Sequence, residues 1–163
     1  MRSNLIRAHR SAAFAAVVVA LLAGAVIAQA PDPHIGVWKL NPAKSKYDPG
    51  PTPKSGTATW EVVAAGIKVT TDGIAADGTP THWESTTKYD GKDSPITGNP
   101  YGDTIARTRI DARTIRSVMK KGGKVTVTQN SVVAPDGKTR TVTTTGVNAA
   151  GQKVNNVAFY EKQ

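Results

Sequence analysis

Aromatic and hydroxyl side chains alternate along short stretches of this sequence, in a pattern that suits the binding of a small molecule. Every second position from 83 to 89 carries such a side chain, namely Trp83, Ser85, Thr87 and Tyr89. All four therefore fall on one face of an extended strand. Aromatic rings combined with a few hydrogen-bonding groups are typical of small-molecule pockets. The alternative interpretation is that these rings fill the interior of the protein and contact no ligand.

Three arginines would set the charge of such a ligand. Arg140 shares a predicted strand face with Val142, and Arg107 and Arg109 share one with Ile105. Charged side chains are rarely buried without a partner, so surface positions are favoured for all three arginines. If one of them is buried, we expect it to bind an acidic or phosphate-bearing ligand. The predicted ligand-binding residues are Trp60, Trp83, Tyr89, Gln129, Arg140 and Tyr160.

Residues that could catalyse a reaction are scarce. His34 precedes the first predicted strand, and His82 lies on the outer face of a predicted strand beside Glu84. A general base needs a positioned partner, and the sequence indicates none for either histidine, so both are interpreted as surface residues. The sequence contains no cysteine and no metal-binding or phosphate-binding motif. We therefore expect no catalysis, no bound metal and no cofactor.

Turn signals separate the runs of Thr and Val that would position these side chains. Asp77-Gly78, Asp90-Gly91 and Asp136-Gly137 each lie between two such runs. An Asp-Gly pair in this setting is a strong hairpin signal, because a type I′ turn needs positive φ at its central residues. The predicted strands are residues 35–40, 57–65, 67–75, 81–89, 94–97, 103–110, 114–121, 124–134, 138–147 and 152–162.

These strands predict an all-β fold. An open sheet of this length would leave two exposed edges, whereas closure removes them. Because consecutive hairpins need no long crossover, we predict an antiparallel up-and-down meander closed into a barrel of about 8–10 strands, in preference to a Greek-key sandwich. Pro49, Pro51 and Pro53 disfavour helix within residues 43–54. We expect that segment to form an irregular flap across one end of the sheet, with at most one helical turn.

Residues 1–30 have the pattern of a secretory signal-peptide helix. An apolar run over residues 12–27 precedes the cleavage pattern Ala28-Gln29-Ala30. The run is shorter than the roughly 20 residues of a spanning helix, so cleavage is favoured over a membrane anchor. We expect residues 31–163 to form one periplasmic or secreted domain that does not span a membrane.

The charge of the chain is moderately basic. Residues 1–30 contain three of the 21 basic residues and none of the 12 acidic ones, which leaves 18 basic against 12 acidic residues and a net charge of +6. The basic residues are scattered, whereas a nucleic-acid-binding domain would cluster them among aromatic residues. We expect a monomer with no nucleic-acid partner.

Two short motifs resemble those of the calycin superfamily, which comprises lipocalin-like and fatty-acid-binding-protein-like barrels. Gly36-Val37-Trp38 resembles the Gly-x-Trp motif of the first strand, and Phe159-Tyr160-Glu161-Lys162 is similar to the last strand of the fatty-acid-binding proteins. The resemblance is closest to small exported bacterial proteins of lipocalin-like type, and it implies that Trp38 plugs the closed end of a barrel. Two features differ: residues 43–54 cannot hold the helical lid, and the arginine of the carboxylate-binding Arg-x-Tyr motif falls on Ala158.

These observations favour an exported β-barrel that binds a small amphipathic or apolar ligand in its lumen, without catalysis. The alternative is a structural or interaction module with a filled barrel, whose basic outer face binds anionic envelope polymers or a protein partner. That face would include Lys68, Lys88, Arg116 and Lys120. A third hypothesis is an enzyme of unrecognised type that uses His82 and Glu84.

Overall fold

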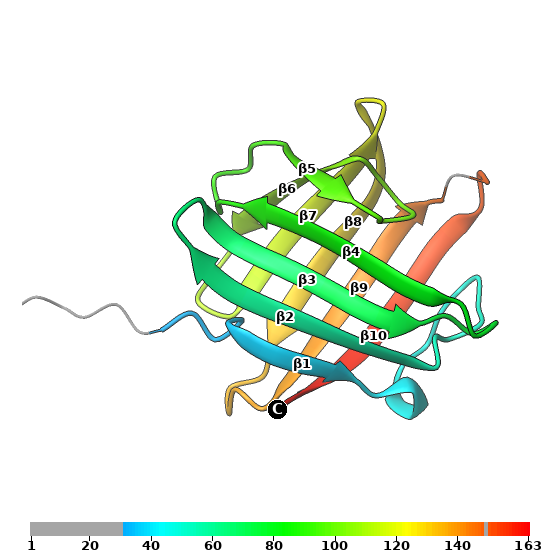
Figure 1. Cartoon of the computed structure of the whole chain (residues 1–163), viewed down its shortest axis with the longest axis horizontal. Coiled ribbons are helices and arrows are strands. Elements are labelled where there is room, and N and C mark those ends of the chain that lie inside the picture. Colours follow the sequence, from blue (N-terminus) through cyan, green and yellow to red (C-terminus); the bar gives the residue numbers. More distant parts are fainter. Residues whose placement is uncertain (1–30, 149) are drawn as a thin grey trace, which may run out of the picture. The chain divides into compact units, whose positions relative to one another are not determined.

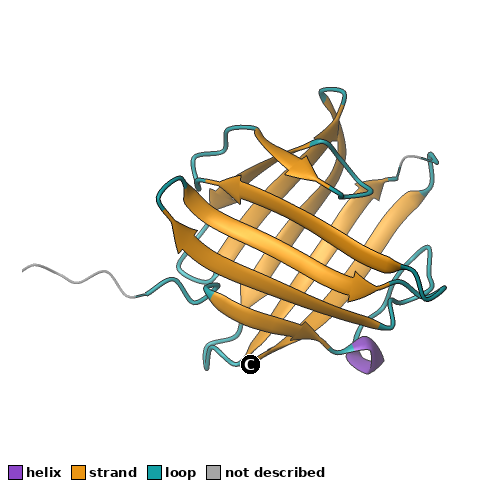
Figure 2. Cartoon of the chain, viewed as in Figure 1, coloured by secondary structure: helices purple, strands orange, loops and turns teal. Residues whose placement is uncertain are grey.

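The computed structural model describes residues 31–148 and 150–163, and within them the chain is almost entirely β-structure (Figure 1). The strands are β1 (Gly36–Leu40), β2 (Ser55–Val63), β3 (Gly66–Ile74), β4 (Pro80–Thr87), β5 (Ser94–Thr97), β6 (Thr104–Arg109), β7 (Thr114–Lys121), β8 (Lys124–Val133), β9 (Thr139–Val147) and β10 (Lys153–Lys162). A short 3-10 helix, η1 (Pro42–Lys44), follows β1. Figure 2 shows this helix in purple beside the strands that form the wall.

The signal peptide expected over residues 1–30 lies outside the described residues. Among the residues that the structure describes, none belongs to a helix long and apolar enough to cross a bilayer.

The sheet closes on itself. Each strand is antiparallel to its neighbour in the sequence, and β1 also pairs with β10. This closing ladder pairs Trp38 with Lys162 and Leu40 with Tyr160. A closed sheet leaves no edge with unpaired backbone groups. The predicted up-and-down barrel is therefore confirmed, with ten strands in the described part of the chain.

The hairpins turn where the Asp-Gly pairs predicted them. Between β8 and β9, the Asp136 carboxylate accepts a hydrogen bond of 2.9 Å from the backbone N–H of Lys138, and Gly137 has a φ of +70°. Glycine adopts this left-handed conformation without the steric cost of a side chain. Equivalent bonds to the carboxylates of Asp77 and Asp90 hold two further turns.

Gly146 allows β9 to pass close to its neighbour β8. Its φ is +148°, and a Cβ placed there would collide with the carbonyl oxygen of Thr126 and lie 2.7 Å from the Cα of Val127. Any other residue would have to push the two strands apart. The glycine thus permits this close approach of the two strands.

Alternation correctly predicted the inner rows along the middle of most strands. Ile115, Ser117 and Met119 on β7 are all buried, as expected. The prediction was wrong for Val125 on β8, which is 61% exposed. The cause is a β-bulge, because the pairing passes from Met119 opposite Val127 directly to Lys120 opposite Val125. The extra residue reverses the inward and outward pattern beyond it.

Two apolar clusters occupy much of the interior. The first comprises Trp38, Ala58, Trp60, Val69, Ile115 and Val133. The second comprises Ile96, Ile105, Met119, Val127 and Val154. Trp83 packs against both. Trp38 is fully buried in the first cluster. Its role as a plug of one barrel end remains a prediction.

The proline-rich segment after η1 is irregular, as predicted, and it is attached to β10. Lys46 forms an antiparallel bridge with Val157. The backbone N–H of Asp48 donates to the Asn156 side chain at 2.9 Å, and the carbonyl of Asp48 accepts from the N–H of Asn155 at 2.7 Å. These bonds hold the flap beside the last strand.

Candidate functional site

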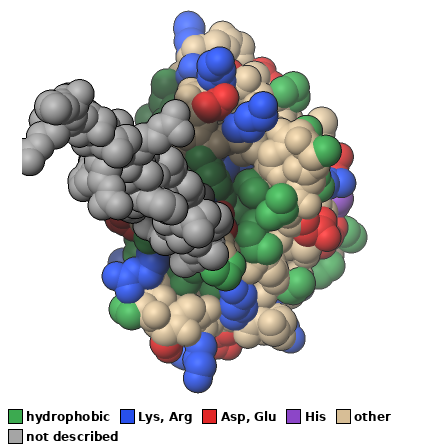
Figure 3. Space-filling view, turned by 90° about the vertical axis from the view of Figure 1, so that its left-hand side faces the viewer, with side chains coloured by type: hydrophobic (Ala, Val, Ile, Leu, Met, Phe, Trp, Pro, Cys, Tyr) green, Lys and Arg blue, Asp and Glu red, His purple; other side chains and the backbone are tan. Residues whose placement is uncertain are grey.

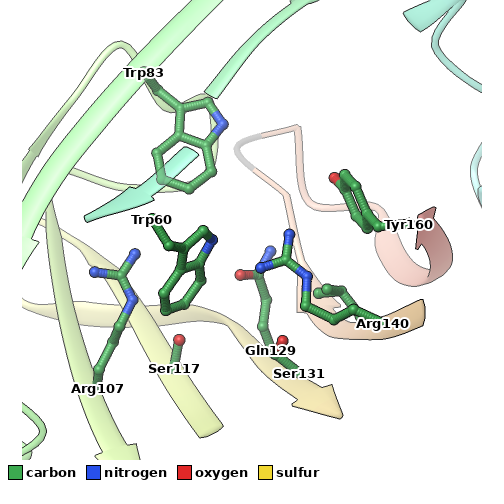
Figure 4. A pocket seen from close by; sticks show the side chains of 9 residues that line it. Trp60, Trp83, Arg107, Ser117, Gln129, Ser131, Arg140 and Tyr160 are labelled. Atoms are coloured by element: carbon green, nitrogen blue, oxygen red, sulfur yellow. The ribbon is translucent and has the colours of Figure 1, made fainter. Parts of the chain in front are cut away.

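A cavity lies inside the barrel among aromatic rings, hydroxyl groups and two arginines (Figure 4). Its volume is about 60 Å³, several times the ~10–15 Å³ that a single water molecule requires. The lining residues are Trp60, Trp83, Arg107, Ser117, Gln129, Ser131, Arg140, Val142 and Tyr160. The barrel interior therefore contains a small cavity whose lining side chains are partly apolar and partly polar.

Five of the six predicted ligand-binding residues line this cavity, and Tyr89 does not. These five residues come from five different strands, and closure of the sheet brings them together. Arg140 on β9 is the direct cross-strand partner of Tyr160 on β10, and Gln129 on β8 faces Thr144 on β9. Ligand binding by these residues remains a prediction.

Arg140 is the most isolated charge in the site. Only 2% of the residue is exposed, and its Nε and Nη1 have no hydrogen-bond partner in the described part of the chain. Its guanidinium carbon lies 4.9 Å from the Trp38 ring centre, 5.2 Å from that of Trp60 and 4.7 Å from that of Tyr160. Burial lowers the pKa of Arg140 to about 10, although the nearby Tyr160 opposes the shift.

Arg107 is equally buried but better satisfied. Its Nη1 donates to the hydroxyls of Ser85 at 3.0 Å and Thr87 at 2.9 Å, while its Nε has no partner among the described residues. Its guanidinium carbon also lies 5.2 Å from the Trp60 ring centre. Burial lowers the pKa of Arg107 to about 10; Tyr89 counteracts the shift, and the positive charge of Arg140 adds to it.

The sequence-based preference for surface positions was wrong for both of these arginines. That preference assumed that a buried arginine needs a carboxylate partner. Here aromatic rings and hydroxyl groups contact the two guanidinium groups instead. Neither Arg107 nor Arg140 forms an ion pair with any residue that the structure describes. A cation–π contact contributes up to about 2 kcal/mol when desolvated, whereas burying a charge costs several kcal/mol. The site thus holds positive charge that the protein only partly compensates.

Other unpartnered donors face the same space. The indole Nε1 of Trp60 and the hydroxyl of Ser131 are buried without a hydrogen-bond partner in the described residues. Buried polar groups are normally paired, so several orphaned groups lining one cavity require an explanation. A ligand that accepts hydrogen bonds would satisfy them. Sequence reasoning had placed Ser131 on the inner face by alternation but had given it no chemical role.

Asp32 organises a second polar cluster just outside this cavity. Its Oδ2 accepts hydrogen bonds from Tyr89 at 2.7 Å and from Arg109, and its Oδ1 accepts from the backbone N–H of His34 at 3.0 Å. Burial alone would raise the pKa of Asp32, but the hydrogen bonds from His34, Tyr89 and Arg109 outweigh it and hold that pKa well below its ordinary value. The Tyr89 hydroxyl, a predicted ligand contact, is therefore engaged by the protein itself.

His34 is fully buried, so its interpretation as a surface histidine was wrong. Its Nδ1 lies 3.2 Å from Asp32, its Nε2 lies 3.4 Å from the carbonyl oxygen of Ser131, and its own carbonyl accepts from Trp38 Nε1 at 2.7 Å. Its ring packs 5.6 Å from that of Trp60. Ser131 is 97 positions away in sequence, so no local pattern could have indicated this environment.

The two residues of the enzyme hypothesis are not assembled into a pair. His82 Nδ1 lies 2.7 Å from Asp72, whereas Glu84 pairs with Lys68 at 3.0 Å, and all four side chains are substantially exposed. No group of three or more His, Asp or Glu side chains among the described residues is placed to hold a metal ion.

Comparison of the chain with protein-family models, with curated proteins and with solved structures gives no match in any of the three. The closed antiparallel barrel is compatible with a calycin-like barrel. The case for a function therefore depends on the cavity and its lining.

Proposed function

We propose that this protein is an exported β-barrel that binds a small amphipathic molecule in its lumen, without catalysis, and that the acidic group of that molecule lies against Arg140. The observation that carries the proposal is the set of unpartnered buried donors around one cavity: Arg107 Nε, Arg140 Nε and Nη1, Trp60 Nε1 and Ser131 Oγ. Export is supported by the pattern of residues 1–30.

The lining supports a ligand with both an acidic and an apolar part. A carboxylate or phosphate accepts charge-assisted hydrogen bonds from a guanidinium, and these are roughly twice as strong as bonds between neutral groups. The rings of Trp60, Trp83 and Tyr160 offer apolar surface to the remainder of the molecule. A cavity of about 60 Å³ favours a compact ligand.

Intrinsic fluorescence tests the proposal directly, because Trp60 and Trp83 line the cavity. The protein is titrated with hexanoate and with hexanol, which share a hydrocarbon chain and differ in charge. We expect hexanoate to change the emission saturably and to bind at least about tenfold more tightly than hexanol, a difference of about 1.4 kcal/mol.

Arginine variants separate the buried site from surface charge. Arg140→Met should remove the preference for hexanoate, whereas Arg113→Met, which alters an exposed arginine, should retain it. Equal affinities for hexanoate and hexanol in the wild-type protein, or full hexanoate binding by Arg140→Met, would overturn the proposal.

The basic outer face of the alternative hypothesis is partly compensated by neighbouring groups. Lys68 pairs with Glu84, and Lys120 pairs with Asp93 at 2.7 Å. Figure 3 shows one face of the molecule, on which Lys and Arg side chains are dispersed among acidic ones. Binding of anionic polymers remains the second candidate, and salt-sensitive retention of the protein on an anionic polysaccharide resin would support it.

A further inference from the structure

We propose that the ligand of this cavity carries two negative charges, one for each of the buried guanidinium groups of Arg107 and Arg140. This inference rests on the proposed lumenal binding function and specifies the charge of the molecule that is bound. A phosphate monoester and a small dicarboxylate both have this property.

The two arginines belong to one site. Arg107 reaches the cavity from β6 and Arg140 from β9, and each guanidinium carbon lies 5.2 Å from the ring centre of Trp60. Figure 4 shows the two groups at the Trp60 ring, with Ser117, Gln129 and Ser131 nearby. A compact ligand in this cavity would interact electrostatically with both guanidinium groups.

Within residues 31–148 and 150–163, no carboxylate forms an ion pair with either guanidinium group. The carboxylate of Asp32 is hydrogen-bonded to His34, Tyr89 and Arg109 and forms no ion pair with Arg107 or Arg140. None of the described residues that line the cavity is acidic. A singly charged ligand would leave one of the two guanidinium groups uncompensated in a buried site, whereas a dianion neutralises both.

The free donors also exceed the needs of one carboxylate. Three arginine nitrogens, Trp60 Nε1 and Ser131 Oγ lack partners among the described residues. A phosphate group offers three acceptor oxygens, and two carboxylates offer four, so either can engage donors from several sides of the cavity. The donors lie on four strands, β2, β6, β8 and β9, so they would approach a bound acceptor group from several directions.

Two matched pairs of ligands test the charge. Hexyl phosphate and hexyl sulfate share a chain and a tetrahedral head group, and at pH 8 the phosphate carries two charges and the sulfate one. Butylmalonate and hexanoate, which differ only by one carboxylate, form the corresponding carboxylate pair. Isothermal titration calorimetry at pH 8 should show at least tenfold tighter binding of the doubly charged member of one or both pairs. The tighter of the two dianions then identifies the head group as a phosphate monoester or a dicarboxylate.

The pH dependence gives an internal check. The second proton of a phosphate monoester dissociates with a pKa of about 6, so hexyl phosphate should lose its advantage between pH 8 and pH 5. Hexyl sulfate keeps one charge over this range, so its affinity reports any change in the protein itself. An advantage of hexyl phosphate that persists undiminished at pH 5 would contradict the proposal for that ligand.

Variants at Arg107 assign the second charge. Arg107→Met should bring the affinity ratio of dianion to monoanion close to one, while Arg107→Lys, which keeps the charge, should preserve a clear preference. Equal affinities for singly and doubly charged ligands in the wild-type protein would overturn this inference and leave the lumenal binding function intact. Failure of every one of these anions to bind would instead overturn the binding function itself.

Discussion

Arg140 and Tyr160 are direct cross-strand partners on β9 and β10, and the guanidinium carbon of Arg140 lies 4.7 Å from the centre of the Tyr160 ring. The resemblance to the fatty-acid-binding proteins had matched the tyrosine and placed the missing arginine at Ala158. The structure shows that an arginine meets this tyrosine from the neighbouring strand instead. Sheet pairing therefore brings an arginine and a tyrosine together, although the sequence contains no Arg-x-Tyr motif at this tyrosine.

Arg140→Met should stabilise the protein in the absence of ligand. Burial lowers the pKa of Arg140 to about 10, so at pH 7 the folded protein holds the charged form at a cost. Replacing a buried charge by an apolar side chain of similar volume is neutral or stabilising by about 1–4 kcal/mol. Urea unfolding at pH 7 measures the change.

Arg107→Met provides the comparison for that measurement. It should stabilise the protein less than Arg140→Met, because it leaves the hydroxyls of Ser85 and Thr87 without their donor. A clear loss of stability in Arg140→Met would show that the arginine has a structural role, and would remove the argument that it is kept for a ligand.

Asp32→Asn should lower the free energy of unfolding at neutral pH and make that free energy depend less on pH in the acid range. The folded-state pKa of Asp32 lies well below the ordinary value of 3.8, so its contribution to stability is fully present above pH 3.8 and is lost as the pH falls below it. We expect a loss of about 2 kcal/mol at pH 7 that shrinks toward pH 2. Denaturant unfolding at both pH values measures the difference.

Asp93→Asn is the matched control for that variant. Asp93 pairs with Lys120 at the surface, where both side chains are partly exposed, so its removal should change stability little at either pH. The importance of the Asp32 cluster is contradicted if the two variants lose equal stability and show the same pH dependence.

Val142→Phe should block ligand binding by filling the cavity while leaving both arginines in place. Val142 lines the cavity and faces Ser131 across the ladder, and a phenyl ring at this position would take up much of its about 60 Å³. We expect the affinity for hexanoate to fall at least tenfold, or by about 1.4 kcal/mol. Val147→Phe, at a 43% exposed position of the same strand, should bind like the wild-type protein. Unchanged binding by Val142→Phe would place the ligand elsewhere.

Gly146→Ala should destabilise the barrel severely. The added Cβ would collide with the carbonyl oxygen of Thr126, and the φ of +148° is itself unfavourable for alanine. We expect a loss above about 2 kcal/mol, because both the clash and the backbone strain must be relieved. Gly137→Ala, at a turn where a Cβ meets no atom within 4 Å, should lose only about 1–2 kcal/mol. Thermal unfolding of the two variants distinguishes these results, and equal losses would contradict the close-packing role of Gly146.

Much of the barrel could be predicted because its signals are local. The Asp136-Gly137 turn and the alternation of Ile115, Ser117 and Met119 depend only on neighbouring residues. Alternation failed at Val125, because a bulge is a property of two paired strands and leaves no clear mark on one of them. It also failed at Val62, which was expected on the inner face but lies at the end of β2 and is 71% exposed.

The candidate site was harder to predict, because its character depends on what surrounds each charge. Alternation put Arg140 on a face with Val142, but the general rarity of unpaired buried charge favoured the surface. The rings of Trp38 and Trp60, which make an interior position tolerable, come from distant parts of the sequence. His34 is likewise buried by contacts with Ser131 and Trp60, and both residues are distant from it in the sequence.

Native mass spectrometry of the protein, purified without denaturation from the cells that make it, tests the central claim most directly. We predict a bound small acidic molecule that is released on denaturation and is absent from the Arg140→Met variant prepared in the same way. A wild-type spectrum with only the bare protein, or the same molecule bound equally by Arg140→Met, would contradict the assignment of the barrel cavity as an anion-binding site.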